Sequence, residues 1–194
     1  TMSTRDIQGS VRIAKQQNEI TPIHAVLTAG TDASMTVAAV ANALNLTGIK
    51  FEDAEAATNK IKMRMRFKEH GVASPAFLPI WTLADAKKAC KILGYTVVIK
   101  PSDNMGARGV RKIQNANELS DAFQFAKGAS PSGEILIEEF MEGPELSIDA
   151  IVYNGDITIT GVADRIIEYP PHFVETGHNM PSALPEEQLI QACN

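Results

Sequence analysis

The sequence predicts a mixed fold, α+β or α/β, in which helices cover one face of a mainly antiparallel sheet. The clearest evidence lies in residues 72–165, where strand, helix, strand, strand, helix and strand patterns precede a final hairpin. That order lacks the strict βαβ alternation of a parallel sheet, so it favours the α+β class. The pair Asn154-Gly155 stands between two apolar runs and is the strongest short hairpin signal in the chain.

Composition narrows the class of function. The 194 residues include 18 basic and 23 acidic side chains, a formal net charge of −5, which argues against a domain that grips nucleic acid or an anionic membrane. The cysteines, Cys90 and Cys193, form no disulfide framework, and the sequence holds no apolar run of about 18 residues. We therefore expect a cytoplasmic protein whose partners are neither nucleic acids nor membranes.

The N-terminal part of the sequence carries few elements. Apolar spacing predicts a helix around residues 7–14 and another over 35–45, with a short strand at 23–28 between them. Ser34 or Asp32 is expected to cap the second helix. A single strand is too little to close a sheet, so we expect these residues to be the remnant of a larger domain.

Two further helices are predicted before the sheet is complete. The first runs over residues 53–70 and is expected to stop at Gly71, because glycine suits a left-handed helix end. After an extended piece at 76–80, Thr82 and Asp85 resemble a capping box that starts the next helix. Together with the strands that follow, this helix belongs to the α+β block.

The rest of the chain supplies the strands and the hairpin. Strands are expected at residues 95–100, 110–113, 134–141, 145–153 and 157–165. Asn117 is expected to cap a helix, and Pro185 followed by two glutamates begins another over 185–192. A two-residue hairpin loop sets Tyr153 opposite Asp156, which brings Glu145 opposite Asp164. This register predicts one polar face made of Glu145, Ser147, Asp149, Ile151, Thr158, Thr160, Val162 and Asp164.

A strand that ends in a lysine and a glycine-containing loop has the character of a phosphate-binding segment. Lys100 ends an apolar strand, and Gly106, Ala107, Arg108 and Gly109 follow in a loop. Backbone N–H groups freed by glycine can approach phosphate oxygens closely, and a lysine adds a positive charge. The alternative is an ordinary hairpin loop with a surface lysine and arginine.

The segment Glu138-Glu139-Phe140-Met141 follows an apolar strand and precedes a Gly-Pro turn. Hinge strands that bind a purine through backbone N–H and C=O groups have this character, with apolar side chains forming the slot. The alternative is a strand end with solvated glutamates.

The collinear order of these motifs resembles the ATP-grasp superfamily, and within it the carboxylate–amine ligases and carbamoyl-phosphate synthetase. The order comprises a helix lysine, the strand-end lysine, the glycine-rich loop, Glu-Glu-Phe-Met and Gly-Pro-Glu-Leu-Ser-Ile-Asp. The resemblance implies four parts. They are a remnant of a pre-ATP-grasp domain (1–52), a linking helix (53–71), the lid subdomain (72–141) and a truncated start of the large subdomain (142–194). Because Thr1 precedes Met2 and the last predicted helix stops after about two turns, we expect a fragment of a longer enzyme.

The resemblance also implies roles for single residues. Lys60 and Lys100 match the lysines that contact the ATP phosphates, and the loop 106–109 would fold over those phosphates. The alternatives are a solvated helix lysine for Lys60 and a salt-bridged surface lysine for Lys100. Glu138 would face the adenine amino group, and the main chains of Glu139 and Met141, with Phe140 between them, would bind the adenine edge. Glu145 matches the acid that holds the ribose hydroxyls. Glu175 is implied to draw an amine and His178 a carboxylate; an exposed loop histidine is the alternative for His178.

One departure from the family pattern concerns the metal. The family holds its catalytic Mg²⁺ through an acidic residue and a following Glu-x-Asn, and no Glu-x-Asn or Asp-x-Asn occurs in this sequence. Mg²⁺ neutralises charge on a transferring phosphoryl group, so it is expected in the intact enzyme and its ligands here stay unassigned, as do catalytic residues.

The resemblance therefore predicts the ATP-binding part of a ligase that activates a carboxylate as an acyl phosphate for attack by an amine-type nucleophile. The 194-residue chain itself is expected to be inactive alone. A homodimer is a further candidate assembly. Two alternatives stay open, a non-catalytic nucleotide-binding or regulatory module and a plain α+β scaffold for protein contacts.

Overall fold

The computed structural model describes residues 3–29 and 32–193, and the chain divides into two compact units. The N-terminal unit is Thr1–Ser74 and the C-terminal unit is Pro75–Asn194. Within the described residues, no helix combines the length and the apolar character needed to cross a membrane.

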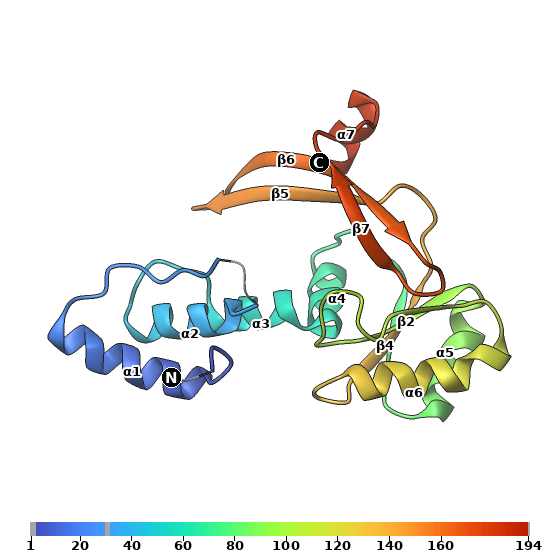
Figure 1. Cartoon of the computed structure of the whole chain (residues 1–194), viewed down its shortest axis with the longest axis horizontal. Coiled ribbons are helices and arrows are strands. Elements are labelled where there is room, and N and C mark those ends of the chain that lie inside the picture. The colour runs from blue at the N-terminus through green and yellow to red at the C-terminus, as the bar shows by residue number, and fades with distance from the viewer. Residues whose placement is uncertain (1–2, 30–31, 194) are drawn as a thin grey trace. The chain divides into compact units, whose positions relative to one another are not determined.

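The regular elements in the described part of the N-terminal unit are all helices (Figure 1). It contains α1 (Ile7–Ile20), α2 (Ser34–Ala43), α3 (Phe51–Thr58) and α4 (Lys60–Glu69), and each helix packs on the next one along the chain. Small side chains fill its interior, which lets the helix axes approach closely: Ala38, Ala41, Ala54 and Ala56 are all buried.

Three predictions for the N-terminal unit are wrong, namely the strand at 23–28, the side-chain cap of the second helix and the single helix over 53–70. The strand expected at 23–28 is irregular chain, because the described part of this unit offers no second strand to pair with it. Helix α2 starts at Ser34 after the N-cap Ala33, without a side-chain cap from Ser34 or Asp32, and ends at Ala43.

The long helix expected over 53–70 is broken at Asn59. The backbone of Asn59 is extended (φ −92°, ψ 114°), and its side-chain oxygen accepts hydrogen bonds from the N–H groups of Ile61 and Lys62. An asparagine that caps the following turn in this way ends one helix and starts another. Lys60 is consequently the first residue of α4 rather than a residue inside a long helix.

The C-terminal unit begins with the predicted antiparallel sheet, here called the first sheet. Its strands are β1 (Phe77–Ile80), β2 (Val97–Pro101), β3 (Arg111–Ile113) and β4 (Ile135–Glu139), in the order β1-β4-β2-β3. All three pairings are antiparallel. The helices α5 (Leu83–Leu93) and α6 (Leu119–Ala129) pack against it, which confirms the predicted fold class.

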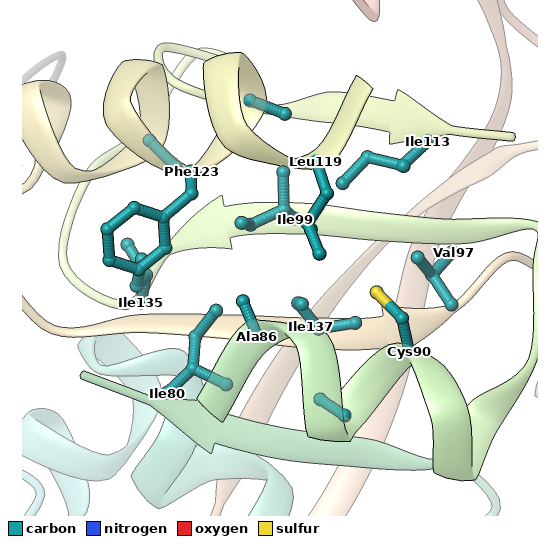
Figure 2. Packing of buried hydrophobic residues seen from close by; sticks show 13 residues of the cluster. Ile80, Ala86, Cys90, Val97, Ile99, Ile113, Leu119, Phe123, Ile135 and Ile137 are labelled. Carbon is teal, nitrogen blue, oxygen red and sulfur yellow. The ribbon is translucent and has the colours of Figure 1, made fainter. Parts of the chain in front are cut away.

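The core of the C-terminal unit lies between the first sheet and these two helices (Figure 2). Alternate strand residues face the helices, and Val97, Ile99 and Ile137 are completely buried. Phe123 of α6 and Cys90 of α5 meet them from the helix side (Figure 2). The opposite alternation, which includes Lys100 and Glu138, therefore lies on the other face of the sheet.

Of the two helix caps predicted in this unit, one is confirmed and one is wrong. The predicted capping box is confirmed, because Thr82 Oγ1 accepts from the N–H of Asp85 while the Asp85 carboxylate accepts from the N–H of Thr82. The cap expected at Asn117 is wrong. Asn115 instead caps a short 3₁₀ turn, η1 (Ala116–Glu118), and α6 begins directly after it.

A second sheet contains β5 (Leu146–Tyr153), β6 (Asp156–Glu168) and β7 (Val174–Asn179), with β6 in the centre (Figure 1). The Asn154-Gly155 hairpin is confirmed, and both turn residues have positive φ angles, 52° and 89°. The predicted helix near the end of the chain is also present, as α7 (Glu186–Cys193).

The predicted hairpin register holds only near the turn. It is correct from Tyr153↔Asp156 to Ala150↔Ile159, and then a bulge shifts the pairing so that Asp149 lies opposite Gly161. Thr160 is the extra residue, and its hydroxyl donates to the carbonyl of Asp149. The polar face expected from the sequence is therefore wrong beyond this point. Val162 and Asp164 pair with Ile148 and Leu146 rather than with Ser147 and Glu145.

Candidate functional site

Lys100 and Glu138 form an ion pair on the face of the first sheet that the helices do not cover. The two side chains come from the neighbouring strands β2 and β4 and are diagonal neighbours in the register. Their side chains are 17% and 4% exposed, so the pair is largely removed from water. The sequence placed Lys100 at the phosphates and Glu138 at the adenine, and the structure brings both side chains together.

The glycine-rich loop has a backbone that requires glycine at Gly109. Its φ angle is +80°, and a Cβ atom there would lie 2.6 Å from the Cβ of Ala129 and 2.7 Å from Pro101. Gly106 and Ala107 are also in the left-handed region, with φ angles of 63° and 56°. The loop is therefore a fixed, unusual backbone rather than an ordinary turn.

The side chain of Asn104 makes three hydrogen bonds that fix the start of this loop. Its amide nitrogen donates to the carbonyl of Ala129 at 2.6 Å, and its oxygen accepts from the Arg108 Nε at 3.0 Å and from the Met105 N–H at 2.9 Å. The guanidinium of Arg108 is thus tied to the loop while the residue stays exposed. Nearby, Asp103 is partly buried, but hydrogen bonds from Ser130 and Ser132 more than offset that burial and lower the pKa of its carboxyl.

The segment predicted to bind adenine continues strand β4 and turns outward. The N–H of Glu139 donates to the carbonyl of Ala76 at 2.9 Å, and the Glu139 carboxylate accepts from the Ala76 N–H at 3.3 Å. The ring of Phe140 lies 3.7 Å below the ammonium of Lys112, and the side chain of Met141 is exposed. Whether the main chains of Glu139 and Met141 bind adenine stays a prediction.

Arg165, on the central strand β6, contacts two of the predicted site residues, one from the ribose end and one from the acceptor end. Its Nη1 lies 3.1 Å from the carboxylate of Glu145, which the sequence assigned to the ribose. Its Nε donates at 2.9 Å to Glu175, and Nη2 contacts the same oxygen. Glu175 also contacts His178 Nε2 at 2.8 Å. The structure thus brings together Glu145, Glu175 and His178, although it was Arg165, absent from the sequence-based assignment, that unites them.

The electrostatics of this cluster follow from Arg165. Its hydrogen bond to Glu175, with the added attraction of the positive charge, lowers the pKa of that carboxyl despite an opposing effect of burial. Glu175 is therefore ionised at neutral pH.

A cavity of about 580 Å³ brings the glycine-rich loop and the Arg165 cluster to one place. Gly106, Ala107, Arg108 and Gly109 line one side, and Arg165 and Glu175 line another. Aromatic and apolar side chains complete the wall: Phe125, His172, Phe173 and Val174. The sequence predicted the loop and Glu175 separately; their shared cavity emerges only from the fold.

Sequence reasoning missed Arg165 and the aromatic wall for different reasons. Arg165 lies beyond the Thr160 bulge, so the predicted register gave it no acidic neighbour. The wall joins Phe125 of α6 to His172 and Phe173 of the β6–β7 connection, and their rings interact with residues far away in the sequence. Phe125 stacks edge-on with His172 at 5.7 Å, and Phe173 lies 6.2 Å from Phe140. No local sequence pattern predicts such contacts.

Lys60 belongs to the other unit. It opens α4, directly after the capping residue Asn59, in the N-terminal unit. Its role at the ATP phosphates stays a prediction.

The fold and these residues define a class of protein, and comparison with known families agrees. The family model described as ATP-grasp domain matches residues 93–193, which is more than half of the chain. The chain belongs to the ATP-grasp family.

Individual relatives share the fold over part of their own length. An uncharacterized protein of Sinorhizobium fredii, y4rH, is 32% identical over 163 residues, which are 81% of this chain and 33% of that protein. The carbamoyl phosphate synthase large chain of Agathobacter rectalis is 26% identical over 167 residues, 85% of this chain and 15% of its own. The solved L-amino acid ligase of Bacillus licheniformis superimposes with a TM-score of 0.80 at 26% identity, covering 97% of this chain and 44% of that one. The chain thus spans at most about a third of these two curated relatives.

Three carboxylates that could bind the Mg²⁺ ion implied by the fold family are engaged by protein groups. Mg²⁺ binds through one or two carboxylates together with substrate phosphates. Glu145 and Glu175 are engaged by Arg165, and Asp164 accepts from Ser182 and from the N–H of Ala183. Across residues 3–29 and 32–193 no group of three or more His, Cys, Asp or Glu side chains is arranged to hold a metal.

Proposed function

We propose that this chain is the ATP-binding part of an ATP-grasp ligase that activates a carboxylate as an acyl phosphate for attack by an amine-type nucleophile. The observation that carries the proposal is the cavity in which the glycine-rich loop and the Arg165–Glu175 pair face the same space. One wall is suited to phosphate and the other to an ammonium group. The L-amino acid ligase of Bacillus licheniformis, whose name describes chemistry of this kind, has a similar fold.

The proposed reaction has two steps. A carboxylate oxygen bonds to the γ-phosphorus of ATP while the bond to the bridging oxygen breaks, so that ADP leaves. The amine nitrogen then attacks the acyl carbon, phosphate departs with the bonding electrons, and the nitrogen loses a proton. The side chains described here form no covalent bond in either step; they bind, orient and neutralise charge.

At the nucleotide end, Lys100 and the loop 106–109 are proposed to bind the phosphates, with Lys60 as a further phosphate ligand. The paired position of Lys100 suits this role, because Glu138 holds the ammonium in place on a face with little access to water. Glu138 and the segment 139–141 are proposed to bind the adenine, and Glu145 the ribose.

At the acceptor end, Glu175 is proposed to attract the amine and His178 a carboxylate. Arg165 keeps Glu175 ionised, which suits the binding of an ammonium group. Phe125, Phe173 and Val174 leave room for an apolar substituent on the amine-type substrate.

The division into subdomains is part of the proposal. Residues 1–52, 53–71, 72–141 and 142–194 are assigned to a pre-ATP-grasp remnant, a link, the lid and the start of the large subdomain. The division of the chain between Ser74 and Pro75, close to the boundary proposed between link and lid, supports it.

The nucleotide assignment is tested by calorimetry with ATP and ADP. Lys100→Ala removes a charge-assisted contact of about 1.5–3 kcal/mol, so nucleotide affinity should fall roughly ten- to hundredfold. Because this change alone removes the ammonium that pairs with Glu138, buried at 3% exposure, the double variant Lys100→Ala/Glu138→Gln is measured as well. Lys15→Ala on the exposed face of α1 is the matched control and should bind nucleotide like the original protein.

Two results would contradict the assignment. Equal ATP affinity in the original protein and the double variant would remove Lys100 from the site. Absence of binding to the original protein at millimolar ATP would contradict nucleotide binding by this chain.

A nucleotide-binding module without catalysis is the second candidate. It is favoured by the engagement of Glu145, Asp164 and Glu175 with protein partners, which leaves them poorly suited as metal ligands. In a longer protein that contains this chain, ATP-dependent formation of acyl hydroxamate from a carboxylate and hydroxylamine would support the ligase. Nucleotide binding by that protein without hydroxamate or phosphate release would support the module.

A further inference from the structure

Arg165 is shared between two carboxylates that belong to different ends of the proposed site. It lies on β6, and its guanidinium reaches Glu145 beside β5 and Glu175 on β7. The backbone supports the same arrangement, because the Arg165 N–H donates to the carbonyl of Glu145 at 2.9 Å and Arg165 lies opposite His178. One side chain thus spans all three strands of the second sheet.

The charges of this cluster do not balance. One guanidinium serves two carboxylates, and the His178 imidazole contacts the second of them. With His178 neutral, the group carries one negative charge in excess. The two carboxylates therefore share the positive charge of Arg165. A hydrogen-bond donor that binds one carboxylate leaves more of that charge to the other.

We propose that Arg165 is a positioning residue that couples the nucleotide end of the site to the acceptor end, because a ligand on Glu145 releases Nη1 and leaves the guanidinium to Glu175 alone. This inference rests on the proposed function, because it takes Glu145 as the contact of the ribose and Glu175 as the contact of the amine. Coupling between two binding equilibria is reciprocal, so an ammonium on Glu175 shifts Arg165 toward Glu145.

The coupling has a chemical use. An amine attacks an acyl phosphate only as the neutral base, whereas a carboxylate beside it stabilises the ammonium form. When Arg165 is released from Glu145, more of its positive charge is available to Glu175, which reduces the negative potential there and lowers the pKa of a neighbouring base. Nucleotide binding would thereby favour the nucleophilic form of the amine.

His178 reports on this potential without any substrate. Its Nε2 contacts Glu175 Oε1 at 2.8 Å, and Arg165 faces it from β6. The other charged groups around Glu175 are Glu145, bound to the same guanidinium, together with Arg108 and His172 across the cavity. The His178 pKa, measured by NMR, therefore follows the position of Arg165.

The decisive experiment is a ligand-free double-mutant cycle. The pKa of His178 is measured in the original chain, in Glu145→Gln, in Arg165→Met and in the double variant. In the arginine background, Glu145→Gln should lower the His178 pKa by several tenths of a unit; in the methionine background it should change it far less. Equal shifts in both backgrounds, or no shift in either, would overturn the coupling.

Controls separate coupling from loss of structure. Arg165→Lys keeps the charge but lacks the fork that reaches two carboxylates, so it should restore much of the stability and little of the coupling. Arg12→Lys, on the exposed side of α1, should leave the His178 titration unchanged. Circular dichroism of every variant checks the fold, and a variant that unfolds is replaced by Arg165→Gln.

A second arm adds ADP. Saturating ADP should lower the His178 pKa in the original chain and leave it unchanged in Arg165→Met; the same response in both would contradict a link through Arg165. Failure of the original chain to bind ADP would contradict the proposed function and the nucleotide end of the coupling, whereas the ligand-free cycle would still decide whether Arg165 links the two carboxylates.

Discussion

The two sheets of the C-terminal unit are held together by different forces. In the first sheet, Ile99, Ile135 and Ile137 are completely buried under α5 and α6. In the second sheet, Val152 and Ile157 are 65% and 68% exposed, and the strands are tied by ion pairs of Arg165 and by hydrogen bonds. The first sheet is a rigid support for the loop that it carries; the second keeps its polar groups accessible to ligands.

Removing the same side-chain atoms from each sheet tests this difference in packing most directly. Ile137→Ala leaves a cavity in a packed core and should lower the free energy of unfolding by about 2–5 kcal/mol. Ile157→Ala removes a side chain that is 68% exposed and should cost roughly 1 kcal/mol or less. Urea unfolding of both variants measures the difference, and equal losses would show that the second sheet is as firmly packed as the first.

An effect of similar or smaller size is expected at the loop that the first sheet carries. Gly106→Ala strains a positive φ angle and should cost about 1–2 kcal/mol. Gly109→Ala adds the close approach to Ala129 and Pro101, which should cost about 1–3 kcal/mol more.

Thermal unfolding of the two glycine variants, side by side, isolates the contribution of the close approach, because both share the backbone strain. A Gly109→Ala variant as stable as Gly106→Ala would mean that Ala129 and Pro101 move aside at little cost.

The smallest effect should appear on acidification. The pKa of the Glu175 carboxyl is held below its ordinary value by the hydrogen bond from Arg165, and that of Asp164 by hydrogen bonds from the N–H of Ala183 and from Ser182. A carboxyl whose pKa is lower in the folded state contributes stability that is complete above its unfolded pKa and is lost as the pH falls through its folded pKa. The second sheet should therefore loosen below about pH 4 before the first sheet does.

Amide hydrogen exchange of β6 and β7 against β2 and β4, followed from pH 6 to pH 3, tests this order. Glu175→Gln removes one titrating group and should show a smaller acid response in β7. Simultaneous loss of protection in both sheets would mean that they unfold as one unit.

Much of the C-terminal unit was predictable because its signals are local. Alternating burial in β2, the Thr82–Asp85 capping box and the Asn154-Gly155 turn each involve residues within a few positions of one another. The break at Asn59 is different, because one side chain competes with a helix pattern that continues on both sides of it. Residues 23–28 have a strand-like sequence but need a partner strand, which no local pattern supplies.

The candidate site was predictable in its parts and not in its assembly. The sequence indicated the glycine-rich loop, Glu145 and Glu175 from the kinds of residues and their order. Their meeting depends on contacts between distant segments, such as the ring of His172 on Phe125 and the guanidinium of Arg165 between two acids. A period-two pattern cannot reveal an extra residue in one strand, so the partner of Glu145 was misplaced.

Thr160, the extra residue in β6, determines whether an acidic or a basic side chain lies opposite Glu145. In a regular hairpin, Asp164 would occupy the position opposite Glu145, and acids would gather there without a cation. Thr160 advances the chain by one position, and Arg165 takes that place instead. Deleting Thr160 should therefore turn an attractive junction between these strands into a repulsive one.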